Sequence, residues 1–278
     1  MVASSGRLEL RNDIWIERLD TELVKRIMRA CEPADYGIQR TVMDRHVYAW
    51  VRVAPDIEVT QFDGIYKLVE AIALSRLVHP TSTSFRYSAW ASDLTLNPRI
   101  IRAVPYHGIS PDILLAPNSR DWLTQAEGAE AKKLMDWLVL PMCDRVRRAF
   151  WNHEYAMRLY ELDLRYPMIV GAFEALTNTN VGKDKWEFVY RTSRFADQLG
   201  VSLTEHELRK AYKLRSKLVH AESFLYGLAD TVALVEQPVL YLKLEKLLRL
   251  TLKECFLNRV FYDRFADANS VRQHFPLP

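Results

Sequence analysis

The pattern of apolar and polar positions changes character near the middle of the chain. Before about residue 120, short patterned segments alternate with prolines and polar turns, a mixture typical of α+β structure. This part predicts a helix over 21–31, a strand over 47–53 and a helix over 62–77. The stretch 97–118 contains four prolines and predicts an extended connector or surface loop.

After Asp121 the apolar positions follow a helical period almost throughout. The predicted helices cover 129–139, 145–166, 167–177, 186–199, 204–220 and 239–261. Pro167 should kink or split the long second segment, because proline lacks the donor for the preceding turn. The polar stretch 178–185, which contains Gly182, suits a loop between two helices.

These elements predict a mainly α chain in two parts, an α+β N-terminal domain over 1–125 and a helical bundle over 126–278. The last long helix is amphipathic, and its leucines predict a core-facing side. Those leucines are Leu240, Leu244, Leu247 and Leu248. Apolar stretches are short or interrupted by charges, and the first residues are polar, so we expect neither a membrane span nor a signal peptide.

The composition of the chain limits its possible size of core, its binding partners and its cellular compartment. A chain of 278 residues with 49% apolar residues can bury a substantial core. The net charge of +3 is too small to indicate nucleic acid binding by itself, so any RNA contact must come from local clustering. The three cysteines are far apart in sequence, which argues against a disulfide framework or a zinc knuckle and favours a reducing, cytoplasmic location.

The helix over 204–220 carries the most informative pattern. Thr204 and Glu207 form a capping-box sequence that marks its start. Its apolar stripe is predicted from Leu208, Ala211, Tyr212, Leu218 and Val219, and Arg215 falls near the middle of that stripe. A guanidinium is costly to bury unless an anion meets it, so its position indicates chemistry or a buried ion pair.

The opposite face of this helix is basic. Arg209, Lys213 and Lys217 recur every four residues, and His220 joins them if the helix continues. Because His220 lies five residues after Arg215, the two would point about 140° apart. Either the helix bends or ends near Val219, or a second copy of the chain supplies half of the site.

The segment Tyr212-Lys213-Leu214-Arg215-Ser216-Lys217-Leu218-Val219-His220 contains an Arg-x4-His pattern at the end of a helix. This pattern resembles the signature of the HEPN superfamily, and most of all its Apea-like branch. The segment 169–176, which ends in Glu174-Ala175-Leu176, resembles the first long helix of that branch, and 188–199 resembles the next. The resemblance covers the chain from about Asp144 onward.

The resemblance implies an all-α bundle that forms a homodimer through its motif helices, and in many members a metal-independent endoribonuclease that needs no cofactor. It implies catalytic roles for Arg215 and His220, with Ser216 and Glu174 in support and Glu174 orienting Arg215. Many relatives have Asn, Asp or His where Ser216 stands, and a glycine where Ala221 stands. By analogy it further implies a toxin or antiviral defence setting, with an antitoxin or regulatory protein as an additional partner.

The two residue types suit RNA cleavage without a metal. A histidine can remove the proton from the 2′-hydroxyl or protonate the leaving oxygen, because its pKa lies near neutrality. An arginine can hold two phosphate oxygens and offset the developing charge. In a symmetric dimer, two Arg215 and two His220 would meet across the two-fold axis, and we expect Arg209, Lys213 and Lys217 to bind RNA beside them.

Other interpretations stay open at this level. Arg215 could form a structural ion pair with Glu174 or Glu222, and His220 could interact with the helix dipole. The basic stripe could be solvated surface. The main alternative function is a non-catalytic HEPN-like module that binds RNA, nucleotide or protein, and a third is a structural dimerisation domain. The remaining histidines lack metal-ligand spacing, and Gly182-Lys183 lacks a Walker context.

Overall fold

The computed structural model describes ten stretches of the chain, namely residues 7–11, 14–17, 48–51, 61–81, 87–91, 100–105, 123–159, 162–180, 182–220 and 231–278. The chain divides into two compact units, each with its own contacts. The first takes in residues 1–75, 81–110 and 120–138, and the second takes in 76–80, 111–119 and 139–278. Helix α4 (Gln125–Leu134), which follows the boundary near residue 125 predicted from the sequence, is grouped with the first unit.

The first unit contains two small antiparallel sheets. Strands β1 (Arg7–Arg11), β2 (Ile14–Glu17) and β3 (Tyr48–Val51) form one, in which Trp15 pairs with Trp50. Strands β4 (Tyr87–Ala91) and β5 (Ile100–Pro105) form the other. The strand expected over 47–53 is therefore present as β3, whereas the predicted helix over 21–31 lies outside the described residues.

The prediction of a connector over 97–118 was wrong for β5, which lies inside that stretch. The proline content misled the interpretation, because proline is compatible with the end of an edge strand where no ladder hydrogen bond needs its missing N–H. Pro105 is the last residue of β5 in a sheet of two strands. Residues 106–118 lie outside the described part of the chain.

Three helical segments complete the first unit: α3 (Gln61–Val78), α4 (Gln125–Leu134) and η2 (Met135–Leu138). Every residue of α3 from Ala71 to Val78 is buried. Thr124 and Glu127 form a capping box that starts α4, and α4 packs against β1. The last residues of α3, from Arg76 on, are grouped with the second unit.

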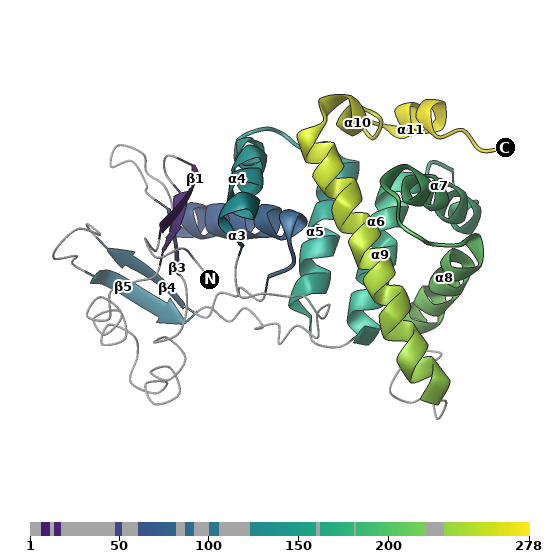
Figure 1. Cartoon of the computed structure of the whole chain (residues 1–278), viewed down its shortest axis with the longest axis horizontal. Helices are drawn as coiled ribbons and strands as arrows, with labels where there is room; N and C mark the ends of the chain where they lie inside the picture. Colours follow the sequence, from purple (N-terminus) through teal and green to yellow (C-terminus); the bar gives the residue numbers. More distant parts are fainter. Residues whose placement is uncertain are drawn as a thin grey trace. The chain divides into compact units, whose positions relative to one another are not determined.

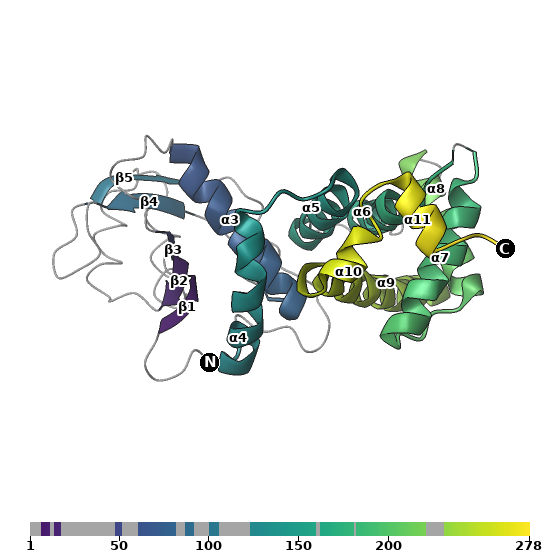
Figure 2. The same cartoon turned by 90° about the horizontal axis from the view of Figure 1, so that it is seen from above.

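The second unit is a helical bundle, coloured from teal to yellow in Figure 1. Its helices are α5 (Asp144–Arg158), α6 (Leu162–Thr177), α7 (Asp184–Leu199), α8 (Glu205–Val219), α9 (Thr231–Leu257), α10 (Arg259–Asp263) and α11 (Ala268–His274). Helix α9 contacts α5, α6 and α7, while α8 packs against α6 and α7 (Figure 1). Figure 2 shows α10 directly after the C-terminal end of α9. The prediction of a mainly α chain is confirmed.

Several helix boundaries differ from the sequence prediction: the helix expected over 129–139 is α4 and η2, and the helix expected over 239–261 begins at Thr231 and ends at Leu257. The junction of α5 and α6 differs as well. Helix α5 ends at Arg158 rather than at Tyr166, and α6 begins at Leu162 with Pro167 inside it. The break therefore precedes the proline instead of coinciding with it. Pro167 lies in the second turn of α6, where its missing N–H removes a single hydrogen bond, to the carbonyl of Asp163, and the helix tolerates that loss.

The core of the bundle is apolar with a buried ionic centre. Leu240, Leu244, Leu247 and Leu248 of α9 are buried as predicted. At its middle, the Glu245 carboxylate accepts hydrogen bonds from His153 at 3.0 Å and Arg249 at 3.1 Å. Burial alone would raise the pKa of Glu245, but these partners outweigh the effect of burial, and the pKa lies below its usual range.

None of the described helices combines the length and apolarity needed to cross a bilayer.

Candidate functional site

Helix α8 begins as its sequence predicts. The Thr204 hydroxyl accepts a hydrogen bond from the backbone N–H of Glu207 at 3.2 Å, and the Glu207 carboxylate accepts one from the backbone N–H of Thr204 at 2.8 Å. This reciprocal capping satisfies two donors that the first helical turn would leave unpaired. The helix ends at Val219, and His220 is its C-cap.

The buried side of α8 differs from the predicted stripe at two positions. Leu208, Ala211 and Leu214 are buried, and Leu214 was not among the expected residues. Val219 was expected to be buried but is 52% exposed. Its angular position matches that of Leu208, so its exposure means that α6 and α7 do not cover the last turn of α8.

Arg215 is paired across the bundle with Glu174 of α6. Its Nη2 donates to Oε2 of Glu174 at 2.8 Å, and the two side chains are 28% and 13% exposed. The guanidinium carbon also lies 6.0 Å from the centre of the Tyr212 ring. Its Nε is buried without a hydrogen-bond partner among the described residues. The ion pair fixes the guanidinium but leaves some of its donors unused.

Glu174 has an unusual electrostatic environment for an ion-pair partner. Burial raises its pKa, while Arg215 and a hydrogen bond from Tyr212 lower it, and the net result is a pKa above the usual range. The pKa of Tyr212 is also raised, first by burial and then by the Glu174 charge. The carboxylate is therefore held by two partners, Arg215 and Tyr212, in a partly desolvated place.

His220 occupies the exposed end of α8. Its backbone N–H donates to the carbonyl of Ser216 at 3.0 Å, so the chain keeps its helical course up to this residue. Its side chain is exposed and forms no hydrogen bond or ion pair with another described residue. On ideal helical geometry His220 would lie about 140° around the helix axis from Arg215, on the side of Lys217. Ala221 and Glu222 lie outside the described residues.

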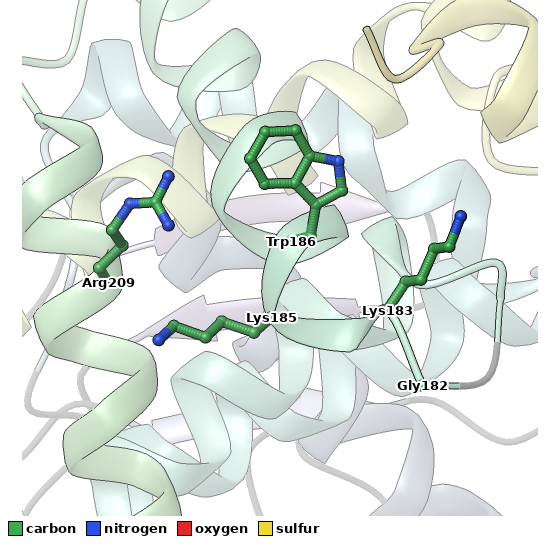
Figure 3. A pocket seen from close by; sticks show the side chains of 5 residues that line it. All are labelled: Gly182, Lys183, Lys185, Trp186 and Arg209. Atoms are coloured by element: carbon green, nitrogen blue, oxygen red, sulfur yellow. The ribbon is translucent and has the colours of Figure 1, made fainter.

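The predicted basic stripe is exposed along its whole length. Arg209, Lys213 and Lys217 are all exposed, and Arg209 is paired with Glu205 at 3.2 Å. Arg209 also lines an open pocket of about 400 Å³ together with residues that precede or begin α7 (Figure 3). Those residues are Gly182, Lys183, Lys185 and Trp186. The structure therefore extends the basic surface from α8 onto the start of α7.

Sequence reasoning missed the α7 side of this surface. A signal was present, because Trp186, Tyr190 and Arg194 recur every four residues in a predicted helix. In the structure the rings of Trp186 and Tyr190 are stacked, with centres 6.1 Å apart and planes 21° apart. The guanidinium of Arg194 lies 5.1 Å from the Tyr190 ring centre and donates to the Tyr190 hydroxyl at 2.6 Å.

A buried carboxylate fixes the loop that carries Lys183. Glu187 accepts hydrogen bonds from the backbone N–H of Thr179, the Thr179 hydroxyl at 2.7 Å, and the backbone and side-chain N–H groups of Asn180 at 3.1 and 2.6 Å. Arg191 lies 3.3 Å from the same carboxylate. Gly182 completes the loop with φ at +82°, a left-handed conformation that suits glycine. Burial alone would raise the pKa of Glu187, yet these hydrogen bonds lower it below the usual range.

The described residues bring no three His, Cys, Asp or Glu side chains together in a way that could hold a metal ion. Comparison of the chain with protein-family models, with curated proteins and with solved structures found no match. The HEPN resemblance accordingly remains a prediction from the motif and the order of the helices.

Proposed function

We propose that this protein is a metal-independent endoribonuclease of the HEPN type that acts as a homodimer. The observation that carries the proposal is the arrangement on α8, where Arg215 is held by Glu174 and His220 stands exposed at the helix end. An arginine that is fixed by an ion pair and is still partly exposed can receive a phosphate. An exposed imidazole with no partner among the described residues can exchange protons with a substrate.

The angle between the two residues supports a site shared by two copies. A continuous helical course would point Arg215 and His220 about 140° apart. His220 directly follows the last residue of α8, so a single chain does not easily direct both side chains at one phosphate. Val219 lies four residues after Arg215 and exposes an apolar side chain beside it. A second α8 packed on this uncovered turn would bury Val219 and bring His220 of one copy toward Arg215 of the other.

The chemistry then follows from the residue types. One histidine removes the proton from the 2′-hydroxyl, which attacks the adjacent phosphorus and expels the 5′-oxygen of the next nucleotide. The second histidine protonates that leaving oxygen, and Arg215 offsets the charge that develops on the phosphate oxygens. The products are a 2′,3′-cyclic phosphate and a free 5′-hydroxyl. Ser216, half-buried beside Arg215, supplies a hydroxyl that can donate or accept but carries no charge.

The biological setting that we propose for this activity rests on analogy with the HEPN superfamily. We infer a cytoplasmic toxin or antiviral defence protein that cleaves RNA, and whose activity a partner protein or the N-terminal unit restrains. The two sheets with α3 and α4 fit an α+β domain in that role. RNA and a second copy of the chain are its proposed partners.

The test is cleavage of a mixed RNA by the purified protein in EDTA, compared with Arg215→Ala, His220→Ala and the control Lys246→Ala, which changes an exposed lysine of α9. We expect both site variants to be inactive, the control to be active, and wild-type products to carry 2′,3′-cyclic phosphates. Mixing the two inactive variants should restore little activity, because the mixed dimer holds one histidine where the proposed mechanism uses two. Equal cleavage by all variants would refute the proposal.

One observation favours a second function. Arg215 already has an anionic partner in Glu174, as a structural pair would have. A non-catalytic module that binds RNA would then keep the basic surface and lack cleavage. Retained RNA binding in EDTA, without cleavage by the wild type at any protein concentration, would select this alternative.

A further inference from the structure

The surface of α7 and α8 contains a second feature that the proposed cleavage chemistry does not use. It is the open pocket between the start of α7 and Arg209, with Trp186 beside it. Trp186 is 41% exposed, an unusual degree for the largest aromatic side chain. Figure 3 shows Lys183, Lys185 and Trp186 on one short segment and Arg209 on α8, with Lys185 extending toward α8 and Lys183 extending away from it.

Charge in this pocket is predominantly positive. Glu205 lies 3.2 Å from Arg209 and offsets that cation, and Asp184 accepts a hydrogen bond from Asn178 at 3.2 Å. Neither Lys183 nor Lys185 forms an ion pair with a described residue. The two lysines are therefore available to an external anion, and phosphate groups are anions that lysine binds as a point charge.

Two side chains of α7 support the aromatic side of the pocket. Tyr190 stacks on Trp186, and Arg194 covers Tyr190 while bonding to its hydroxyl. The three side chains form a row along one face of α7 at four-residue spacing. An aromatic ring that is fixed in this way and still exposed offers its face to a planar group at little cost in conformational entropy.

The pocket is continuous with the basic stripe. Arg209 lines the pocket, and Lys213 and Lys217 continue from it along the exposed face of α8 to His220. From Arg209 to His220 the helix rises about 16 Å. A strand anchored in the pocket can thus follow a line of cations to the exposed imidazole.

From this geometry we infer that the pocket of Lys183, Lys185, Trp186 and Arg209 is a binding site for single-stranded RNA, in which a base stacks on Trp186 and adjacent phosphates contact the lysines. This inference rests on the proposed function for its ligand, because it makes the pocket the anchor for the RNA that His220 would act on. We expect the pocket to bind RNA without preference for a base sequence, since every base can stack on an aromatic ring.

The test separates binding from cleavage by use of the His220→Ala protein, which keeps the RNA intact. Binding of a labelled single-stranded RNA of about 12 nucleotides is measured by fluorescence anisotropy over a series of salt concentrations. Each pocket change is added to this background: Trp186→Ala, Trp186→Phe and Lys185→Ala. Tyr155→Ala and Lys246→Ala serve as controls, because they remove an exposed aromatic ring and an exposed lysine elsewhere in the bundle.

The two kinds of contact have different signatures. Trp186→Ala should weaken binding about tenfold and leave the salt dependence unchanged, while Trp186→Phe should retain most of the affinity. Lys185→Ala should reduce the slope of log affinity against log salt by about 0.7, the value for one phosphate contact on a single strand. The controls should match the background protein. An abasic oligonucleotide of equal length should lose the same affinity as Trp186→Ala loses.

Unchanged affinity in Trp186→Ala, or equal binding of the abasic strand, would overturn the inference and mark a surface for polyanions in general, such as an acidic protein. The proposed function fails separately. If the wild type does not cleave RNA while Trp186→Ala still weakens binding, the inference stands and the nuclease proposal falls. If the wild type cleaves RNA and Trp186→Ala binds RNA normally, the nuclease proposal stands and the inference about the pocket falls.

Discussion

Replacement of Glu187 by alanine should be among the most damaging changes in the bundle. This buried carboxylate joins the loop after α6 to helix α7, through hydrogen bonds from Thr179 and Asn180 and an ion pair with Arg191. Arg191 is itself only 1% exposed and donates to the carbonyl of Phe275 at 2.9 Å. Removal of the carboxylate therefore leaves the buried Arg191 guanidinium without its counter-charge, and the N–H groups of Thr179 and Asn180 without this acceptor.

The magnitude follows from what is left unpaired. Breaking a buried ion pair by removal of one partner costs about 3–5 kcal/mol of the free energy of unfolding, since the remaining charge is uncompensated. For a unit of this size, each kcal/mol corresponds to about 2–4 °C in the melting temperature. We expect Glu187→Ala to lower the melting temperature by about 10 °C. Glu187→Gln should lie between the two proteins, because its amide keeps one acceptor oxygen but presents an NH₂ to neighbouring donors.

The assay is thermal and urea unfolding of the full chain followed by circular dichroism, with Asp197→Asn as the control. Asp197 is an exposed carboxylate on the same helix, and its replacement should change the unfolding free energy by less than about 0.5 kcal/mol. A loss below about 1 kcal/mol for Glu187→Ala would refute the reasoning, because it would mean that water or other groups replace the carboxylate without cost.

The same group predicts a dependence on pH. The folded pKa of Glu187 lies below its usual value, so between the folded and unfolded pKa values the unfolded chain binds more protons and stability rises with pH. The contribution is fully present above the unfolded pKa, about 4.3, and is lost as the pH falls through the folded pKa. The difference in stability between wild type and Glu187→Gln should thus shrink below about pH 4.3. A constant difference down to pH 3 would contradict the assigned role.

Three further predictions concern α8 and α9. Thr204→Ala removes the hydroxyl of the capping box and should cost about 1 kcal/mol of unfolding free energy, measured by urea denaturation, whereas Ser202→Ala, which changes an exposed hydroxyl two residues earlier, should have little effect. Leu247→Ala empties a fully buried position of α9 and should cost about 2–5 kcal/mol by the same measurement, and a cost near that of an exposed leucine would mean the site collapses. Val219→Glu should leave the melting temperature of the monomer within about 2 °C, because Val219 is 52% exposed, but should abolish the proposed dimer in light scattering; an unchanged dimer would place the interface elsewhere.

Local sequence signals determined much of the bundle, because each depends on residues within one or two helical turns. The capping box of Thr204 and Glu207, the buried leucines of α9 and the loop before α7 were all predicted and are present. Boundaries were less accurate where tertiary packing overrides local preference. The break before Pro167 and the strand β5 among prolines are examples, since neither helix start nor strand pairing depends on proline alone.

Only the tertiary structure decided which partners the informative residues have. From the sequence, Arg215 could pair with Glu174 or Glu222, and the structure places Glu174 of α6 at 2.8 Å. Similarly, Arg209 and Trp186 lie 23 residues apart in sequence and come together because α7 and α8 pack side by side. Contacts between helices depend on how their apolar faces meet, so a pattern along one helix determines the face that is buried but not the residue that it meets.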